Sequence, residues 1–140
     1  MPDTDLSRFV DVGKALGHPA RLRMLAMLRD GDLCVCQFTA ILGLANSTVS
    51  AHLAELRRAG LVTERKEGRW VHYELTTDPT LARLVGDVLA GIRNDPVISQ
   101  DRRLVQALRR VPTDVLCRAG LDLQAVGVKP AAPRALGGRP

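Results

Sequence analysis

The chain has 140 residues, of which 46% are hydrophobic and 25% are charged, and its formal net charge is +5. This length fits one domain that buries a core without disulfide bonds, and no apolar run is long enough to cross a bilayer. The N-terminal segment has no basic stretch followed by an apolar one, so we expect a cytoplasmic protein without a signal peptide.

The positive charge is concentrated near the C-terminal end of the sequence. Residues 102–140 contain eight basic and two acidic side chains, whereas the first 101 residues contain twelve basic and thirteen acidic ones. A solvated tail explains this excess as well as an additional contact with nucleic-acid phosphates does. Net charge alone therefore does not identify a partner.

The first half of the chain predicts four helices, because apolar residues recur there at helical spacing. Pro19 is accepted in the first turn of the second helix, and Asp32 is well placed to cap the third. Asn46 or Ser47 is expected to cap the fourth, since short polar side chains accept hydrogen bonds from free backbone N–H groups. The four helices are expected over about 6–16, 20–29, 33–42 and 46–59.

A β-hairpin and further helices follow. Residues 61–66 and 69–75 are rich in Val, Thr, Trp and Tyr, and they predict two strands joined at Glu67-Gly68, where glycine can adopt a positive φ. The helical segments predicted beyond the hairpin are a fifth helix over 81–92, a short one over 100–110, and one or two turns over 113–119. Prolines and glycines predict disorder from about residue 126 onward.

This order of elements predicts a mainly α-helical fold with a small β-hairpin wing, which is a winged helix-turn-helix. Two short helices joined by a glycine-containing turn, followed by a hairpin, are typical of that fold. Residues 1–111 are expected to form the DNA-binding and dimerisation domain. Residues 112–140 are expected to form a largely flexible C-terminal extension that carries Cys117.

Polar and basic side chains gather on the segments expected to read DNA. Small hydroxyl groups at the start of the fourth helix allow its backbone to approach DNA closely, and basic groups follow one turn later and at the hairpin. Any solvent-exposed helix has a polar face, so the combination with the hairpin is what favours DNA binding. The predicted contacts are Asn46, Ser47, Thr48, Ser50, His52, Arg57, Arg65, Lys66 and Arg69, with His52 expected to face outward.

Several stretches between Val12 and Leu75 resemble the ArsR/SmtB family of metal- and metalloid-responsive repressors. The resemblance implies a regulator without enzymatic activity that binds double-stranded operator DNA. It also implies a homodimer built on helices around 6–16 and 80–93, and a palindromic operator that matches the two-fold symmetry. The matching stretches are residues 16–23, 32–37, 47–53, 57–62 and 67–73.

The three cysteines, Cys34, Cys36 and Cys117, are an odd number, which favours free thiols over a disulfide framework. Buried cysteine often packs as a small hydrophobe, but thiolates also select soft metal and metalloid ions. A Cys-x-Cys pair just inside a helix start, where the dipole favours thiolate, points to ligation. Residues i and i+2 lie about 200° apart around a helix, so chelation by both requires the first turn to unwind or bend.

Residues 32–37 are similar to the arsenite- and antimonite-sensing box of arsenic repressors. The similarity implies that arsenic(III) or antimony(III) is the inducer and that its binding releases the operator. The box carries a third cysteine where this chain has Thr39. The missing donor is then Cys117 of the same or the partner subunit, or a small cellular thiol, unless two thiols suffice.

Other sites of the family lack their ligands in this sequence. The fifth helix contains no histidine for an interfacial zinc site, and no cysteine precedes Cys34 for a cadmium/lead site. His18, His52 and His72 are expected to be scattered and hydrogen-bonded or solvated. One alternative is a redox- or persulfide-responsive repressor that uses the same cysteines. A thiol enzyme such as an arsenate reductase is disfavoured, because no phosphate-type loop surrounds the cysteines.

Overall fold

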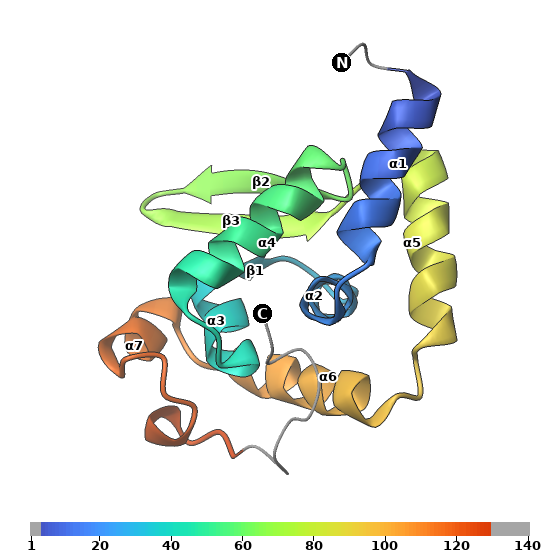
Figure 1. The fold of residues 1–140 in the computed structure, drawn as a ribbon. Coiled ribbons are helices and arrows are strands. Elements are labelled where there is room, and N and C mark those ends of the chain that lie inside the picture. Colours follow the sequence, from blue (N-terminus) through green and yellow to red (C-terminus); the bar gives the residue numbers. More distant parts are fainter. Residues whose placement is uncertain (1–3, 130–140) are drawn as a thin grey trace.

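A computed structural model describes residues 4–129 of the chain (Figure 1). No helix within this range combines the length and apolar composition that a bilayer span requires. The disorder expected toward the C-terminus concerns residues 130–140 for the most part, and these lie outside the described residues. The elements are α1 (Asp5–Leu16), α2 (Pro19–Met27), β1 (Leu33–Cys34), α3 (Val35–Leu42), α4 (Asn46–Arg58), β2 (Val62–Glu67), β3 (Trp70–Leu75), α5 (Pro79–Gly91), α6 (Pro96–Leu108), α7 (Thr113–Arg118) and the 3-10 helix η1 (Gln124–Val126).

Helices α3 and α4 form a helix-turn-helix, and the β2–β3 hairpin forms the wing beside it (Figure 1). Gly43 ends α3 in the left-handed conformation with φ 68°, and the fully buried Phe38 and Leu53 hold the two helices against the core. The wing strands pair antiparallel, and Gly68 turns the hairpin with φ 63°. The winged helix-turn-helix predicted from the sequence is confirmed.

Strand β1 was not predicted, and it changes the start of the third helix. Leu33 pairs with Tyr73 and Cys34 with His72 on β3, so the backbone stays extended through Cys34. The helix therefore begins at Val35 rather than at about residue 33. Asp32 lies before β1 and does not cap α3, so that prediction is wrong.

The start of α4 also differs from the prediction. Its N-cap residue is Ala45, whose side chain provides no cap, and neither Asn46 nor Ser47 fills that position. Asn46 instead accepts a hydrogen bond of 2.9 Å from the hydroxyl of Thr39. This bond links α3 to the first turn of α4.

Helix α6 is longer than predicted and belongs to the core. Asp95 caps its first turn, and the helix packs on α2 and α3. Asp101 receives two hydrogen bonds from Arg23 of α2, with Nε–Oδ2 and Nη2–Oδ1 distances of 2.7 and 2.9 Å. Both side chains are almost completely buried, so this ion pair fixes α6 inside the domain.

The segment after α6 folds back over the helix-turn-helix. Helix α7 contacts α3, and η1 follows it (Figure 1). The buried side chains of Leu116, Leu123 and Val128 anchor residues 113–129 to the core. This packing differs from the largely flexible arm expected for the segment, because the apolar residues that anchor it are too sparse to form a periodic pattern.

Candidate thiol site and DNA-contacting surface

The fold brings Cys117 of α7 against the cysteine pair at the start of α3. The Sγ atoms of Cys36 and Cys117 lie 3.0 Å apart, although 81 positions separate the two residues in the sequence. Cys34 ends β1, is almost completely buried, and lies close enough for its thiol to affect the ionisation of Cys36. All three cysteines are free.

The three thiols do not form a complete metal site in this conformation. Among residues 4–129, no three His, Cys, Asp or Glu side chains are arranged so that they could hold one metal ion. The expectation that Cys34 and Cys36 both lie on the helix is wrong, because Cys34 is the extended N-cap residue. Because Cys34 lies in extended backbone at the end of β1, its joint coordination with Cys36 does not require a helical turn to unwind.

Cys36 is protonated at neutral pH. Burial, a hydrogen bond with Cys117 and the proximity of Cys34 together raise its pKa to about 12. The helix dipole was expected to favour a thiolate, and this expectation is wrong because burial outweighs it. Thr39, at the position of the missing third cysteine, is buried and occupied by its bond to Asn46.

A cavity of about 450 Å³ lies between the wing and α7 and reaches the thiol of Cys117. Arg69 and Trp70 line it from the wing, and Asp114, Cys117 and Arg118 line it from α7. Cys117 is only partly buried. Cys36 is partly buried as well but does not line this cavity, so a small solute in the cavity contacts the thiol of Cys117.

Most of the predicted DNA contacts lie on the surface. Asn46, Ser47 and Ser50 of α4 are exposed, and Thr48 is half-buried. The predicted basic contacts Arg57, Arg65, Lys66 and Arg69 are exposed as well.

Two of these arginines are held by carboxylates. Arg57 pairs with Glu64 at 2.9 Å, and Arg65 pairs with Asp32 at 2.8 Å. Arg69 lies over the ring of Trp70, with its guanidinium carbon 5.0 Å from the ring centroid. A phosphate that binds Arg57 or Arg65 must therefore compete with an existing partner.

His52 is the exception, because it faces the interior. Only 9% of the residue is exposed, and its ring centroid lies 4.5 Å from that of His18. Its Nδ1 lies 3.2 Å from Nη1 of Arg21, whereas Nε2 has no hydrogen-bond partner in the described part of the chain. Burial, with His18 and Arg21 adding to it, lowers the pKa of His52. The prediction of an outward DNA contact is wrong.

His18 and His52 make hydrogen bonds, within the hydrogen-bonded or solvated roles predicted, but the histidines are not all scattered. His18 caps α2 through Nδ1, which accepts from the backbone N–H of Ala20 at 3.0 Å, and its ring touches that of His52. His72 of β3 lies 3.3 Å from the carboxylate of Asp32. The pairing of His18 with His52 joins segments 34 residues apart, which periodicity cannot reveal.

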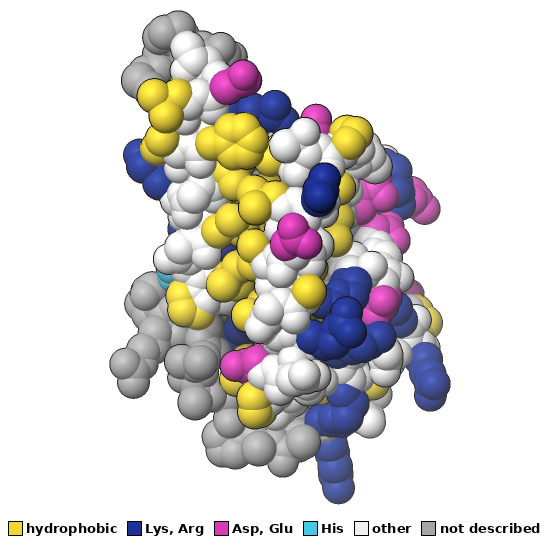
Figure 2. Space-filling model, turned by 90° about the vertical axis from the view of Figure 1, so that its right-hand side faces the viewer, with side chains coloured by type: hydrophobic (Ala, Val, Ile, Leu, Met, Phe, Trp, Pro, Cys, Tyr) yellow, Lys and Arg dark blue, Asp and Glu magenta, His cyan; other side chains and the backbone are white. Residues whose placement is uncertain are grey.

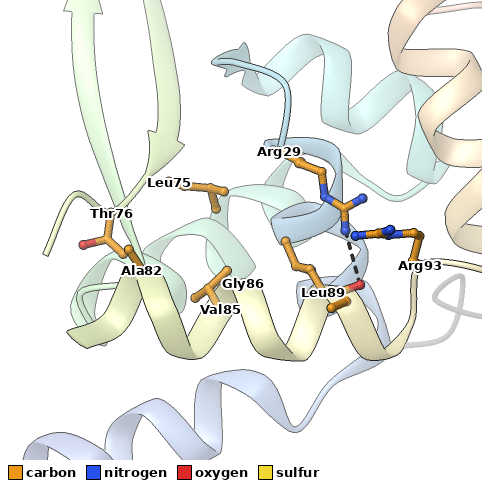
Figure 3. Close-up of a pocket in the computed structure, with 9 residues that line it drawn as sticks. Arg29, Leu75, Thr76, Ala82, Val85, Gly86, Leu89 and Arg93 are labelled. Atoms are coloured by element: carbon orange, nitrogen blue, oxygen red, sulfur yellow. Dashed lines mark hydrogen bonds between the residues drawn. The ribbon is translucent and has the colours of Figure 1, made fainter. Parts of the chain in front are cut away.

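Helix α5 also borders a cavity, of about 210 Å³, together with α2 and β3 (Figure 3). Its lining consists of apolar side chains, Thr76 and two arginines, and Arg29 donates to the carbonyl of Leu89 at 3.2 Å. The lining contains no histidine, cysteine or carboxylate.

Comparisons with known proteins agree with this fold. The model of bacterial regulatory proteins of the arsR family matches residues 18–64. The chain is 38% identical over 110 residues to the arsenic resistance transcriptional regulator ArsR1 of Pseudomonas putida. This alignment covers 76% of this chain and 84% of that protein. It is 40% identical over 113 residues to the HTH-type transcriptional regulator CmtR of Mycobacterium tuberculosis, and this alignment covers 81% of each protein.

A solved structure shows the same architecture. The homodimeric winged helix-turn-helix DNA-binding domain Mb0332 of Mycobacterium bovis superposes with a TM-score of 0.56 and 32% sequence identity. The match covers 65% of this chain and 90% of that one.

Proposed function

Because the chain belongs to the ArsR family of bacterial regulatory proteins, we propose that it is an arsenic(III)- or antimony(III)-responsive repressor. It is a DNA-binding transcriptional repressor and not an enzyme. In this proposal a homodimer binds a palindromic operator and leaves it when the metalloid binds Cys34, Cys36 and Cys117. Residues 1–111 bind DNA and dimerise, and the extension supplies the third sulfur.

The contact between Cys36 and Cys117 is the observation that carries the proposal. It places the extension's thiol beside the Cys-x-Cys pair of the same subunit, at a Sγ–Sγ distance of 3.0 Å. Arsenic(III) is a soft centre with three ligands, and three sulfurs from β1, α3 and α7 match that number. No thiol from outside the chain is then needed.

The raised pKa of Cys36 favours a metalloid acid over a divalent cation as the ligand. Arsenous acid condenses with three thiols, so that three As–O bonds are replaced by As–S bonds and three water molecules leave. No net proton is released. A divalent cation must displace a proton from each thiol that it binds, which is costly where burial has raised the pKa of Cys36 to about 12.

Coordination of Cys34 provides a route to the DNA-contacting elements. Cys34 pairs with His72 of the wing, and α3 is tied to α4 by the Thr39–Asn46 hydrogen bond. A shift of Cys34 toward the other two sulfurs therefore disturbs the β1–β3 pairing. Ligand and DNA then favour different conformations, which is the condition for allosteric release.

The exposed apolar face of α1 and α5 supports the homodimer. Leu6, Phe9 and Val10 of α1 are 78%, 42% and 47% exposed, and Figure 2 shows an apolar band along this side of the molecule. Arg8 joins α1 to the start of α5 through a 3.4 Å ion pair with Asp78. A second copy that packs on this face removes the exposed apolar groups from water.

The decisive experiment is a titration of the reduced protein with arsenite. As–S absorbance and release of an operator, selected from random-sequence DNA, are measured in the same samples. We expect both signals to rise together in the native protein, and Cys34→Ser or Cys36→Ser to keep DNA binding but abolish release. Zinc serves as the control ion and should release little DNA. Normal release by arsenite in the Cys34→Ser/Cys36→Ser variant would contradict the proposal.

A second candidate function is supported by the same sulfur contact. Peroxide can oxidise Cys36 and Cys117 to a disulfide, in which each thiol loses a proton and an electron and the peroxide is reduced to two water molecules. Release of the operator by peroxide, reversal by a dithiol, and no response to arsenite under reducing conditions would favour this function. A persulfide at either cysteine has the same test with a polysulfide donor.

A further inference from the structure

The side chain of Asp32 joins the thiol site to the wing. Its carboxylate lies 2.8 Å from Nη2 of Arg65 on β2 and 3.3 Å from Nδ1 of His72 on β3. One carboxylate therefore holds both wing strands. Asp32 also stands only two positions before Cys34.

The backbone at Asp32 is held from the opposite side by α6. The guanidinium of Arg109 donates to the carbonyl oxygens of Asp32 and Gly31 at 2.9 and 3.0 Å. Gly31 has φ 141°, a conformation suited to glycine, and a Cβ there would meet the Arg109 guanidinium at 3.4 Å. Arg109 directly follows α6, and the next helix, α7, carries Cys117. The loop that contains Gly31 and Asp32 is thus connected both to the segment of Cys34 and Cys36 and, through Arg109, to the segment of Cys117.

We propose that Asp32 is a positioning residue that aligns the wing for operator DNA and transmits the state of the thiols to it. With the thiols free, the carboxylate fixes the wing and keeps Arg65 from nonspecific phosphate contacts. When a ligand draws Cys34 toward Cys36 and Cys117, the loop shifts and Asp32 releases Arg65 and His72. The second step rests on the proposed function, whereas the alignment of the wing does not.

The test compares Asp32→Asn with Glu67→Gln. Both variants remove one negative charge beside Arg65, because Glu67 lies 3.2 Å from the same guanidinium, but Glu67 contacts neither the loop nor a thiol-bearing element in the described structure. Affinities for the selected operator and for random DNA are measured over a range of salt concentrations. Circular dichroism and thermal unfolding establish that each variant is folded.

For Asp32→Asn we expect the ratio of operator to random-DNA affinity to fall about twofold to fivefold, the scale of an exposed ion pair. The salt slope for random DNA should steepen by at most about one, because Arg65 loses the closer of its two carboxylate partners and neutralises a phosphate more readily. Adding Asp32→Asn to Arg65→Ala should leave the slope unchanged. Glu67→Gln should keep the native ratio and the native response to arsenite.

A native affinity ratio and a native salt slope in folded Asp32→Asn would overturn the proposal. If Asp32→Asn does not fold, Arg109→Gln frees the loop from α6 without changing the wing or the thiols, and it should reduce arsenite-induced release. Native release in that variant would likewise overturn the coupling. If the native protein does not respond to arsenite at all, the proposed function fails, but the affinity ratio still tests the alignment.

Discussion

Cys36 determines how the thiol site responds to pH. Its pKa of about 12 keeps the thiol protonated throughout the physiological range. The reaction with arsenous acid converts thiols and hydroxyl groups to As–S bonds and water, whereas binding of Cd²⁺ releases protons. The two ligands therefore differ in their dependence on pH.

We expect the arsenite dissociation constant to change less than about twofold between pH 6 and 8, because no proton is exchanged. The affinity for cadmium should rise about tenfold per pH unit for each thiol proton that it displaces. Absorbance titrations of the reduced protein at several pH values measure both. An arsenite affinity that rises as steeply as that of cadmium would show that thiolates, and not thiols, are present in the free site.

The buried His52 makes the stability of the fold depend on pH as well. Burial is the main cause that lowers its pKa, so the folded protein binds a proton there less readily than the unfolded chain, whose histidines titrate near 6.5. The stabilisation is present above the unfolded pKa and is lost as pH falls through the folded one. The free energy of unfolding in urea should thus decrease from pH 7.5 to 5.5. His52→Gln should show a shallower decrease, and an unchanged profile would contradict this assignment.

Helix α7 contributes to the site through packing as well as through its sulfur. Leu116 is almost completely buried, so residues 113–129 are already ordered before a ligand binds. Binding therefore does not carry the entropic cost of ordering this segment. Cys117→Ser should then weaken the arsenite response about tenfold without eliminating it.

A variant that keeps all three thiols isolates the packing contribution. Leu116→Ala removes a buried side chain at a cost of about 2–5 kcal/mol, which loosens α7 and should also reduce arsenite affinity. Val115→Ala changes an exposed residue of the same helix and is the matched control. Arsenite titrations followed by absorbance compare the two, and equal affinities would show that the position of α7 does not matter.

Helix α4 and the wing are expected to read DNA in different ways. Ser50→Ala should lower operator affinity about threefold to tenfold and leave random-DNA affinity unchanged, because one hydroxyl contact is lost. Arg69→Ala should weaken binding to all sequences and flatten the salt slope by about one, since one phosphate contact disappears. Salt-dependent binding curves for both DNAs distinguish these outcomes. A sequence-selective effect of Arg69→Ala would place this residue at a base.

The helices were predictable because their apolar spacing and turn residues are local. Strand β1 was not, since two extended residues gain their structure only from pairing with β3. Likewise, the polar residues around His52 in the sequence predicted an exposed side chain, whereas its contacts with His18 and Arg21 hold the ring in the interior. The third thiol could be named from the sequence, but its approach to Cys36 depends on anchors such as Leu116.

At the scale of the whole molecule, dimerisation is the first property to test. Phe9→Glu places a charge within the exposed apolar face and should convert the dimer to a monomer, with loss of operator binding, because one subunit covers only half of a palindromic site. Light scattering after size-exclusion chromatography measures the mass. Lys14→Gln changes the net charge by the same amount on the same helix and should remain dimeric. A dimeric Phe9→Glu protein that binds the operator normally would exclude this interface.

The buried pair of Arg23 and Asp101 has a consequence for local opening of the chain. Separating α6 from α2 would break both hydrogen bonds of this pair and expose the apolar side chains packed between the two helices. The backbone amide protons of α2 and α6 should therefore exchange with deuterated water at a common slow rate, set by global unfolding. Those of α7, anchored by fewer buried side chains, should exchange through smaller and more frequent openings. Helix α7 is thus expected to open locally on a scaffold that opens only as a whole.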